Sequence, residues 1–425
     1  MTSGKKAAGI ILLGILVVII AAGAVYSHFG GFGTGESADP AEFAKFAVPV
    51  PELTVPEGTR IIALGEATHG NREFQELKLE VLKVLVEKYG VRALAMEADY
   101  GCCEAVNRYI HGGEGTPEEA AAALGFAIYR TQEIADLIDW MRAYNEAAPQ
   151  EEDLRFYGFD MQRVEYNYQY LLEAMQSAGL ETADLEKLWD GDGLSGDLSA
   201  DERAAVITDI REKLLEANEG YGAHLAEILL QCNEMSRIYQ DSFVNYNGVR
   251  DGYMAENVLW ILDQEENRGN GKVFITGHNG HIEQLGTYPG GEQKVMGNLL
   301  ADEIGKDAYF AIGTEFYRTT CNLPTRSGKR VTRSFYSRDP LAKAAMRSEL
   351  AISLLDYSRI PEDSSLNNYV KGYIYMGSVG EDPMDGLNGL VYRILPQAYR
   401  IYRCPSELYD GMIFVEEAHP IEIRD

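Results

Sequence analysis

One glycine-bounded segment combines a carboxylate and an imidazole at close spacing. In the run GEATHG (65–70), Glu66 and His69 lie three residues apart between two glycines, which are expected to let the backbone turn tightly. The pair suits a general base oriented by an acid, because an imidazole accepts protons near neutral pH. A histidine that caps a helix, beside a glutamate that satisfies loop amides, is the competing interpretation.

Further ionisable residues follow other strand-like runs. GHNGH (277–281) holds His278 and His281, two of the seven histidines, directly after KVFIT. Glu97 follows the run VRALAM, and Asp160 follows the run LRFY. Structural residues placed at random would seldom gather behind four strands in this way. We therefore expect these side chains to meet the first pair at one edge of a parallel sheet, where open α/β sheets bind ligands.

Two basic residues fall on otherwise apolar helix faces. Lys78 lies one turn after Phe74, and Arg250 shares a face with Met254 and Val258. A basic side chain in such a place needs a carboxylate or a route to solvent. We expect both residues either to border the site or to form structural ion pairs.

Alternating strands and helices are predicted to position these residues. TRIIAL (59–64) and VRALAM (91–96) flank an amphipathic helical pattern, which predicts a parallel βαβ start. Further strands are expected at residues 154–157, 272–276, 308–312, 372–375 and 411–415. The fold class is predicted to be α/β, with a parallel or mixed sheet flanked by helices. Helical patterns dominate from about residue 165 to 266, so a helical insertion that could form a cap is expected there.

The N-terminus carries the uncharged apolar run Ala7–Tyr26, close to the roughly 20 residues that a helix needs to cross a bilayer. Lys5 and Lys6 precede it, which predicts a cytoplasmic N-terminus and an extracytoplasmic domain. A cleaved signal peptide, processed near Ala22-Gly23-Ala24 and releasing a secreted protein, is the competing prediction. The expected organisation is therefore a membrane anchor or signal segment (1–26), a flexible linker (27–41) and a folded domain (42–425).

Composition narrows the possible partners and chemistry. Sixty-six acidic residues against 38 basic ones give a net charge of −28, which would repel phosphate backbones and makes nucleic acid an unexpected partner. The sequence contains no G-x-S-x-G nucleophile elbow, no P-loop and no H-E-x-x-H zinc signature. Three histidines and several carboxylates could still bind zinc or iron, so a metal-dependent hydrolase stays an alternative. A noncatalytic surface protein that binds a ligand in the same cleft is a third.

Several linked motifs resemble the erythromycin esterase family. The resemblance runs from about residue 42 to the C-terminus and is carried by the following segments: GEATHGNREFQELK (65–78), AMEADY (95–100), YRTQEIADLIDWMRAYN (129–145), YGFDMQ (157–162), VRDGYMAENVLW (249–260) and GHNGHI (277–282). It implies hydrolysis of a carboxylic ester or lactone, such as a macrolide, by water that a histidine activates without metal or cofactor.

The resemblance also implies roles for individual residues. His69 would be the general base, with Glu66 and Glu97 orienting it and the water. The residues implied to bind the ester or stabilise charge on its carbonyl oxygen are Lys78, Arg250, His278 and His281. Asp160 lies in the motif YGFDMQ and is assigned to substrate binding. Tyr100 stands where the family often has tryptophan, which puts the surface that binds the substrate ring in doubt.

Overall fold

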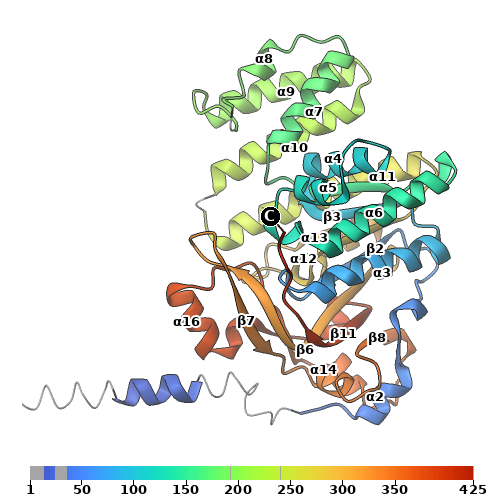
Figure 1. The fold of residues 1–425 in the computed structure, drawn as a ribbon, viewed down its shortest axis with the longest axis vertical. Coiled ribbons are helices and arrows are strands. Elements are labelled where there is room, and N and C mark those ends of the chain that lie inside the picture. Colours follow the sequence, from blue (N-terminus) through green and yellow to red (C-terminus); the bar gives the residue numbers. More distant parts are fainter. Residues whose placement is uncertain (1–13, 24–35, 192, 240, 425) are drawn as a thin grey trace, which may run out of the picture. The chain divides into compact units, whose positions relative to one another are not determined.

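The computed structural model describes residues 14–23, 36–191, 193–239 and 241–424. The chain divides into two compact units, each of which joins segments that are far apart in the sequence (Figure 1). Unit 1 consists of Met1–Thr54, Gly65–Val81 and Ile312–Glu422. Unit 2 consists of Val55–Leu64, Leu82–Ala311 and Ile423–Asp425.

Unit 2 is built on a parallel sheet. Its strands, in spatial order, are β4 (Arg155–Asp160), β3 (Ala93–Asp99), β5 (Val273–His278) and the first part of β2 (Ile61–Glu66). β3 pairs in parallel with both neighbours, so that Leu94 lies beside Phe156 on one side and Phe274 on the other. Every residue of β3 is buried. This burial explains why the strand begins with a continuous apolar run instead of an alternating pattern.

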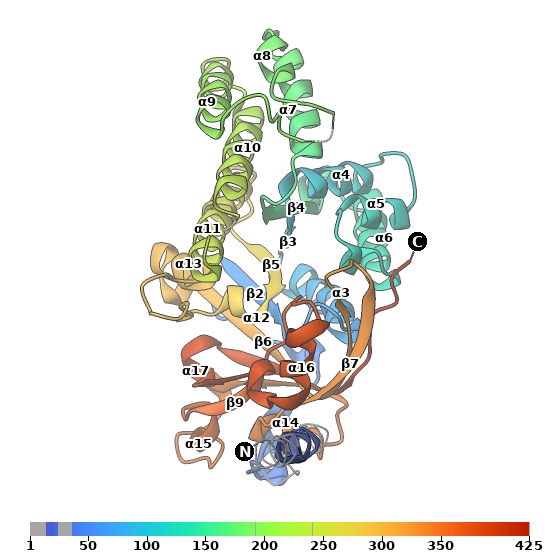
Figure 2. The same ribbon diagram turned by 90° about the vertical axis from the view of Figure 1, so that its left-hand side faces the viewer.

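Helices cover the sheet of unit 2 and extend beyond it. In chain order they are the second part of α3 (Arg72–Tyr89), α4 (Tyr100–Ile110), α5 (Pro117–Ala123), α6 (Gln132–Ala147), α7 (Glu165–Ser177), α8 (Ala183–Glu186), α9 (Ala200–Glu216), α10 (Gly220–Ile238), α11 (Phe243–Asn267), α12 (Asn279–Ile282) and α13 (Met296–Ile304). The segment in which a helical insertion is predicted contains α7–α11, and α10 packs against both α7 and α9 (Figure 1 and Figure 2). α9 begins at a capping box formed by Ser199 and Glu202, a pairing that satisfies backbone N–H groups at the helix start. The role of this segment as a cap stays a prediction.

Unit 1 is built on a mixed sheet. Its strands are β1 (Ala47–Val48), β8 (Ile352–Asp356), β11 (Gly411–Ala418), most of β6 (Tyr309–Pro324) and β7 (Arg330–Tyr336). β11 runs parallel to β6 and antiparallel to β8. β6 and β7 form a hairpin whose turn includes Gly328 at φ 77°, a conformation that glycine adopts without strain.

Short elements complete unit 1. The strands β9 (Ile374–Gly377) and β10 (Arg400–Arg403) form a separate antiparallel pair. The helices are α2 (Pro40–Phe46), the first part of α3, α14 (Pro340–Ala345), α15 (Asn367–Val370), α16 (Gly386–Ile394) and α17 (Pro405–Leu408). Asp39 caps α2 and Pro40 follows it as the first helical residue, a combination typical of helix starts.

The fold is α/β with a mixed nine-stranded sheet. The strand order is β1-β8-β11-β6-β2-β5-β3-β4, with β7 beside β6. β2 and β6 each begin in unit 2 and end in unit 1. Of the two sheet types that the sequence left open, the mixed type is the one found.

The predicted membrane segment is only partly described. Residues 14–23 are helical. Across the described ranges, no helix is both long and apolar enough to span a membrane. The rest of the predicted segment, residues 7–13 and 24–26, lies outside the described residues, as do residues 27–35 of the predicted linker. The anchor and its possible cleavage stay predictions.

Candidate functional site

Glu66, His69 and Lys78 form a cluster within unit 1. Glu66 is the last residue of β2, His69 lies in the loop that follows, and Lys78 lies on α3. Glu66 Oε1 lies 2.6 Å from His69 Nδ1, and Lys78 Nζ donates to Glu66 Oε2 at 2.5 Å. The exposed fractions of the three side chains are 3%, 11% and 2%. One buried carboxylate therefore holds both a histidine and a lysine.

The ionisation of Glu66 decides how the ring of His69 is protonated. Burial alone would raise the pKa of the Glu66 carboxyl, but Lys78 and His69 outweigh burial and lower this pKa to about 2. An ionised carboxylate only accepts hydrogen bonds, so His69 Nδ1 is the donor of their bond. In a neutral ring the lone pair then lies on Nε2. This nitrogen is therefore the one that can accept a proton from a reactant.

Close packing of the backbone fixes the loop that carries His69. Asn322 N donates to Gly70 O at 3.0 Å, and a Cβ on Gly70 would lie 2.2 Å from Asn322 O. The next side chain, Asn71, is buried and donates to backbone oxygens of Thr320 and His419. Gly70 is thus required for the close approach of β6 rather than for a left-handed turn.

Glu97, Asp160 and Arg250 form the core of a second cluster, within unit 2. Glu97 lies on β3, Asp160 ends β4, and Arg250 lies on α11. Arg250 Nη2 donates to Glu97 Oε1 at 2.9 Å, while Nε and Nη2 donate to the two oxygens of Asp160 at 3.1 and 2.5 Å. All three residues are buried. The two carboxylates therefore fix the guanidinium in a forked, charge-assisted geometry.

His278 belongs to the same cluster through its backbone. It is the last residue of β5, and its N–H donates to Glu97 Oε2 at 2.7 Å. Its ring caps α12, because Nδ1 accepts from the N–H of Gly280 at 3.2 Å. A neutral ring that accepts at Nδ1 carries its proton on Nε2, so the geometry assigns Nε2 as a hydrogen-bond donor.

His281 lies between two carboxylates of unit 2. Its Nδ1 lies 2.7 Å from Asp251 Oδ1, and its Nε2 lies 3.4 Å from Glu97 Oε1. Burial would lower the pKa of His281, but Asp251 and Glu97 outweigh burial and raise it. The hydroxyl of Tyr288 also donates to Asp251. His281 is therefore protonated more readily than an ordinary histidine.

Sequence reasoning missed Asp251 and Tyr288. Asp251 is fully buried and directly follows Arg250 in the motif VRDGY. Its position beside a candidate site residue was a usable signal. Tyr288 lies in the segment after α12, where no repeating pattern marks it.

The structure places Tyr100 among aromatic side chains. It is the first residue of α4 and is buried. Its ring packs edge-on against His224 and Trp260, at centroid distances of 4.7 and 5.7 Å. This packing gives Tyr100 a structural role, and its predicted role in substrate binding stays a prediction.

Eight of the nine candidate residues therefore fall into two clusters. Glu66, His69 and Lys78 form the unit 1 cluster. The unit 2 cluster contains Glu97, Asp160, Arg250, His278 and His281. The expectation that all of them meet at one sheet edge stays a prediction.

The metal-dependent alternative requires carboxylate and imidazole groups that together could bind a metal ion. Within the described part of the chain, no three His, Cys, Asp or Glu side chains are grouped so that they could hold a metal ion. In the unit 1 cluster, Lys78 and His69 each contact one oxygen of Glu66. In the unit 2 cluster, Arg250 supplies the positive charge between Glu97 and Asp160.

Known proteins resemble this chain over most of its length. The sequence model of the erythromycin esterase family matches residues 86–418. An Escherichia coli protein named erythromycin esterase type II is 26% identical over 379 residues, which cover 77% of this chain and 88% of that protein. A solved structure of a Bacillus cereus protein has a TM-score of 0.73 at 20% identity and covers 91% of this chain and 100% of its own. A mutant of the erythromycin esterase EreC in its open conformation has a TM-score of 0.58 at 16% identity, with coverages of 87% and 93%.

Proposed function

Because this chain belongs to the erythromycin esterase family, we propose that it hydrolyses a carboxylic ester or lactone with water activated by His69. The region that matches the family begins at residue 86, after the GEATHG segment. The role of His69 is therefore supported by the geometry of its own cluster. The observation that carries the proposal is the contact of His69 Nδ1 with the ionised, buried Glu66.

In the proposed reaction, water is the nucleophile. His69 Nε2 takes a proton from water while the water oxygen forms a bond to the carbonyl carbon. Glu66 keeps the Nδ1–H oriented and stabilises the imidazolium that results. The proton then passes from Nε2 to the leaving oxygen as the bond between that oxygen and the carbonyl carbon breaks. No acyl-enzyme forms in this scheme.

Lys78 is proposed to act through Glu66. Its ammonium contacts Glu66 Oε2 and is buried, so it lowers the pKa of the carboxyl that orients His69. This contact favours a positioning role over direct binding of substrate.

The unit 2 cluster is proposed to bind the ester and to stabilise charge on its carbonyl oxygen. The donor on His278 Nε2 and the guanidinium of Arg250 suit an oxygen that becomes negative. Glu97 and Asp160 hold Arg250 in place. His281 lies beside the guanidinium, with its Nε2 3.3 Å from Arg250 Nη1, and its carboxylate neighbours raise its pKa. Donors fixed in advance stabilise such a charge better than mobile ones, because they need no reorganisation during the reaction.

A substrate screen with an isotope label tests the proposal. The full chain would be assayed against macrolides, simple lactones and aryl esters, and a substrate that is turned over would then be hydrolysed in heavy-oxygen water. Direct attack by water predicts that the product acid carries the label after a single turnover. Mass spectrometry that detects an acyl adduct on any side chain would contradict the proposal. Loss of activity with chelator and its return with zinc would favour the metal-dependent alternative.

A further inference from the structure

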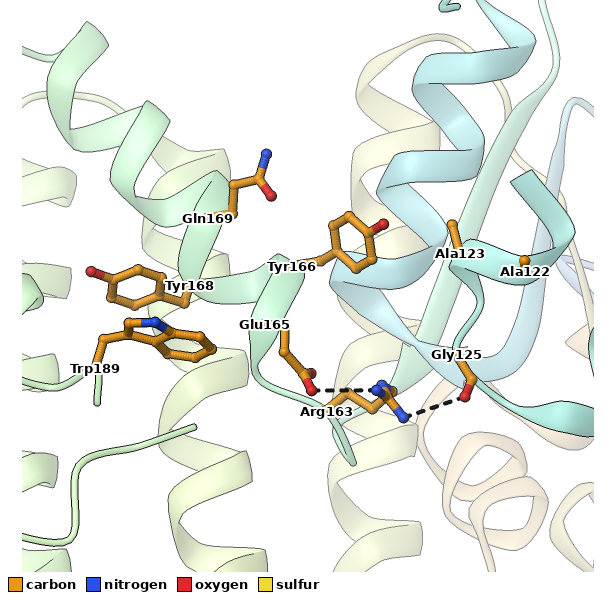
Figure 3. Close-up of a pocket in the computed structure, with 9 residues that line it drawn as sticks. All are labelled: Ala122, Ala123, Gly125, Arg163, Glu165, Tyr166, Tyr168, Gln169 and Trp189. Carbon is orange, nitrogen blue, oxygen red and sulfur yellow. Dashed lines mark hydrogen bonds and ion pairs between the residues drawn. The ribbon is translucent and has the colours of Figure 1, made fainter. Parts of the chain in front are cut away.

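A pocket of about 510 Å³ lies within unit 2 beside the start of α7 (Figure 3). Small residues at the end of α5 line part of it, the first turns of α7 line another part, and Trp189 comes from the segment after α8. Its volume falls within the range of sites that hold small molecules. The proposed hydrolysis assigns no role to this pocket.

Three aromatic side chains contribute to the lining. Tyr168 stacks on Trp189, with ring centroids 4.6 Å apart and an angle of 18° between the planes. Tyr166 extends from the same helix toward Ala122 and Ala123 (Figure 3). All three rings are half-buried. Tyr and Trp rings held in this way present apolar faces and polar edges, and ordering them on binding costs little entropy.

The polar part of the lining carries no net charge. Arg163 Nη2 donates to Glu165 Oε1 at 3.3 Å, and Nη1 donates to Gly125 O at 3.3 Å. Gly125 has a φ of 81°, a conformation that favours glycine, and a Cβ there would lie 2.7 Å from Arg163 Cδ. Gln169 adds an amide to the same lining. Since Arg163 and Glu165 balance each other, the pocket favours a neutral polar ligand over an ion.

The backbone beneath the pocket is firmly held. Arg163 N donates to the buried Asp99 Oδ2 at 3.0 Å, and Asn167 Nδ2 donates to Arg163 O and to Asp99 Oδ1, each at 2.8 Å. Arg163 lies three residues after Asp160 of the unit 2 cluster. The pocket is thus built on the same strand ends as that cluster.

We propose that this pocket binds a neutral sugar ring. A sugar ring has a C–H face that fits against aromatic rings such as those of Tyr166 and Trp189. Its rim of hydroxyl groups fits the planar donors and acceptors of Arg163, Glu165 and Gln169. An anion would meet Glu165 in a chain of net charge −28, and a cation would meet Arg163. The inference goes beyond ester hydrolysis and can be tested without it.

Calorimetric titration of the full chain tests this inference. The probes are cellopentaose and maltopentaose, and the protein is kept in a detergent without a sugar headgroup. At least one probe is expected to bind in a saturable manner. Trp189→Ala is expected to weaken that binding by at least about tenfold, since aromatic anchors carry a large share of binding energy. Absence of binding by both probes overturns the proposal.

Matched variants separate binding from folding. Trp140→Ala removes a tryptophan on α6 that packs on Tyr144, and it should leave binding unchanged. Trp189→Phe and Tyr168→Phe keep a ring and should each weaken binding less than Trp189→Ala. Equal weakening by Trp140→Ala and Trp189→Ala overturns the proposal. The proposal is also overturned if choline binds more tightly than either sugar and Trp189→Ala abolishes that choline binding. Such a result would assign the pocket to cations.

Discussion

The carboxylate of Glu66 contacts both Lys78 and His69, and its ionised form stabilises both side chains. Lys78 needs a carboxylate because its ammonium is buried, and His69 needs an ionised acceptor that fixes which ring nitrogen is basic. The carboxyl pKa of about 2 meets both needs. The group that could act as a base is therefore Glu66, His69 and Lys78 together rather than a lone histidine.

Replacing His69 by Asn should remove the base and leave the fold intact. General-base catalysis typically contributes about 10²–10⁴-fold, so kcat for an ester that the parent hydrolyses should fall by that order. Steady-state kinetics measure kcat, and equilibrium binding of a non-hydrolysed analogue checks that the substrate is still bound. His111→Asn is the matched control, because His111 pairs with Asp153 at the end of α4. Near-normal turnover by folded His69→Asn would move the assignment to His278 or His281.

The sequence predicted these residues to different degrees. Glu66 and His69 could be found because a short glycine-bounded segment carries both. Asp251 could not be found with the same ease. On α11 the side chains of Arg250 and Asp251 point in directions about 100° apart, so adjacency in the sequence draws attention to Asp251 but does not show that both reach the same cluster. Which atom of His278 donates could not be predicted either, because it follows from a contact with the N–H of Gly280.

Among the strands, the sequence predicted several that are apolar on both faces but missed β8, whose residues Ser353–Asp356 are also buried. β2, β3 and β5 lie close to their predicted positions because each begins with a buried apolar run. The strand β7 was not predicted, because it is mostly half-exposed and rich in arginine and hydroxyl side chains. β6 is longer than predicted, because after Ile312 it continues through polar residues such as the buried Glu315. Burial of polar residues depends on partners far away in the sequence, and a local pattern does not contain them.

Lys78→Met should destabilise unit 1, even though a methionine suits the apolar surroundings of position 78. The variant leaves Glu66 buried without its main positive partner, and removal of one partner of a buried pair typically costs about 3–5 kcal/mol. Denaturant unfolding measures this cost. The double variant Glu66→Gln with Lys78→Met should be more stable than Lys78→Met alone, because no unpaired charge remains. Lys83→Met, on the same helix over the Trp140 ring, is the control. Unchanged stability of Lys78→Met with a reduced kcat would instead place Lys78 on the substrate.

A buried acid pair in unit 1 should make stability fall as pH rises. Burial raises the pKa of Asp339, which caps α14, to about 7, and burial together with Asp339 raises that of Glu315 on β6. The folded state therefore binds protons more tightly than the unfolded state. The resulting stabilisation is full below about pH 4 and is lost as pH rises towards 7.

The melting temperature should accordingly decrease between pH 5 and pH 7.5. Asp339→Asn keeps an oxygen for the helix cap but cannot ionise, so it should flatten this decrease. Glu362→Gln changes the charge at an exposed side chain and should leave the slope unchanged. The same slope in Asp339→Asn as in the parent would contradict the assignment.

For the whole molecule, the side of the membrane on which the folded domain lies determines which substrates it can encounter. The charge of −28 is compatible with either side of a membrane. The orientation is instead predicted by the basic residues Lys5 and Lys6 before the apolar run Ala7–Tyr26. We propose that the domain faces outside the cell, so its substrate would be an ester or lactone encountered there.

Protease treatment of intact cells tests this orientation. An uncleaved anchor predicts that the protein remains in the membrane fraction and that protease added outside releases the domain by cutting within residues 27–41, while a cytoplasmic marker protein stays intact. A cleaved signal predicts the protein in the medium, with a new N-terminus near Ala24. Moving the positive charges from before the apolar run to positions just after Tyr26 should reverse the orientation, since basic residues near the ends of a span determine it. A domain that resists protease until the cells are broken would show that the predicted orientation is wrong, and the search for substrates would then turn to esters inside the cell.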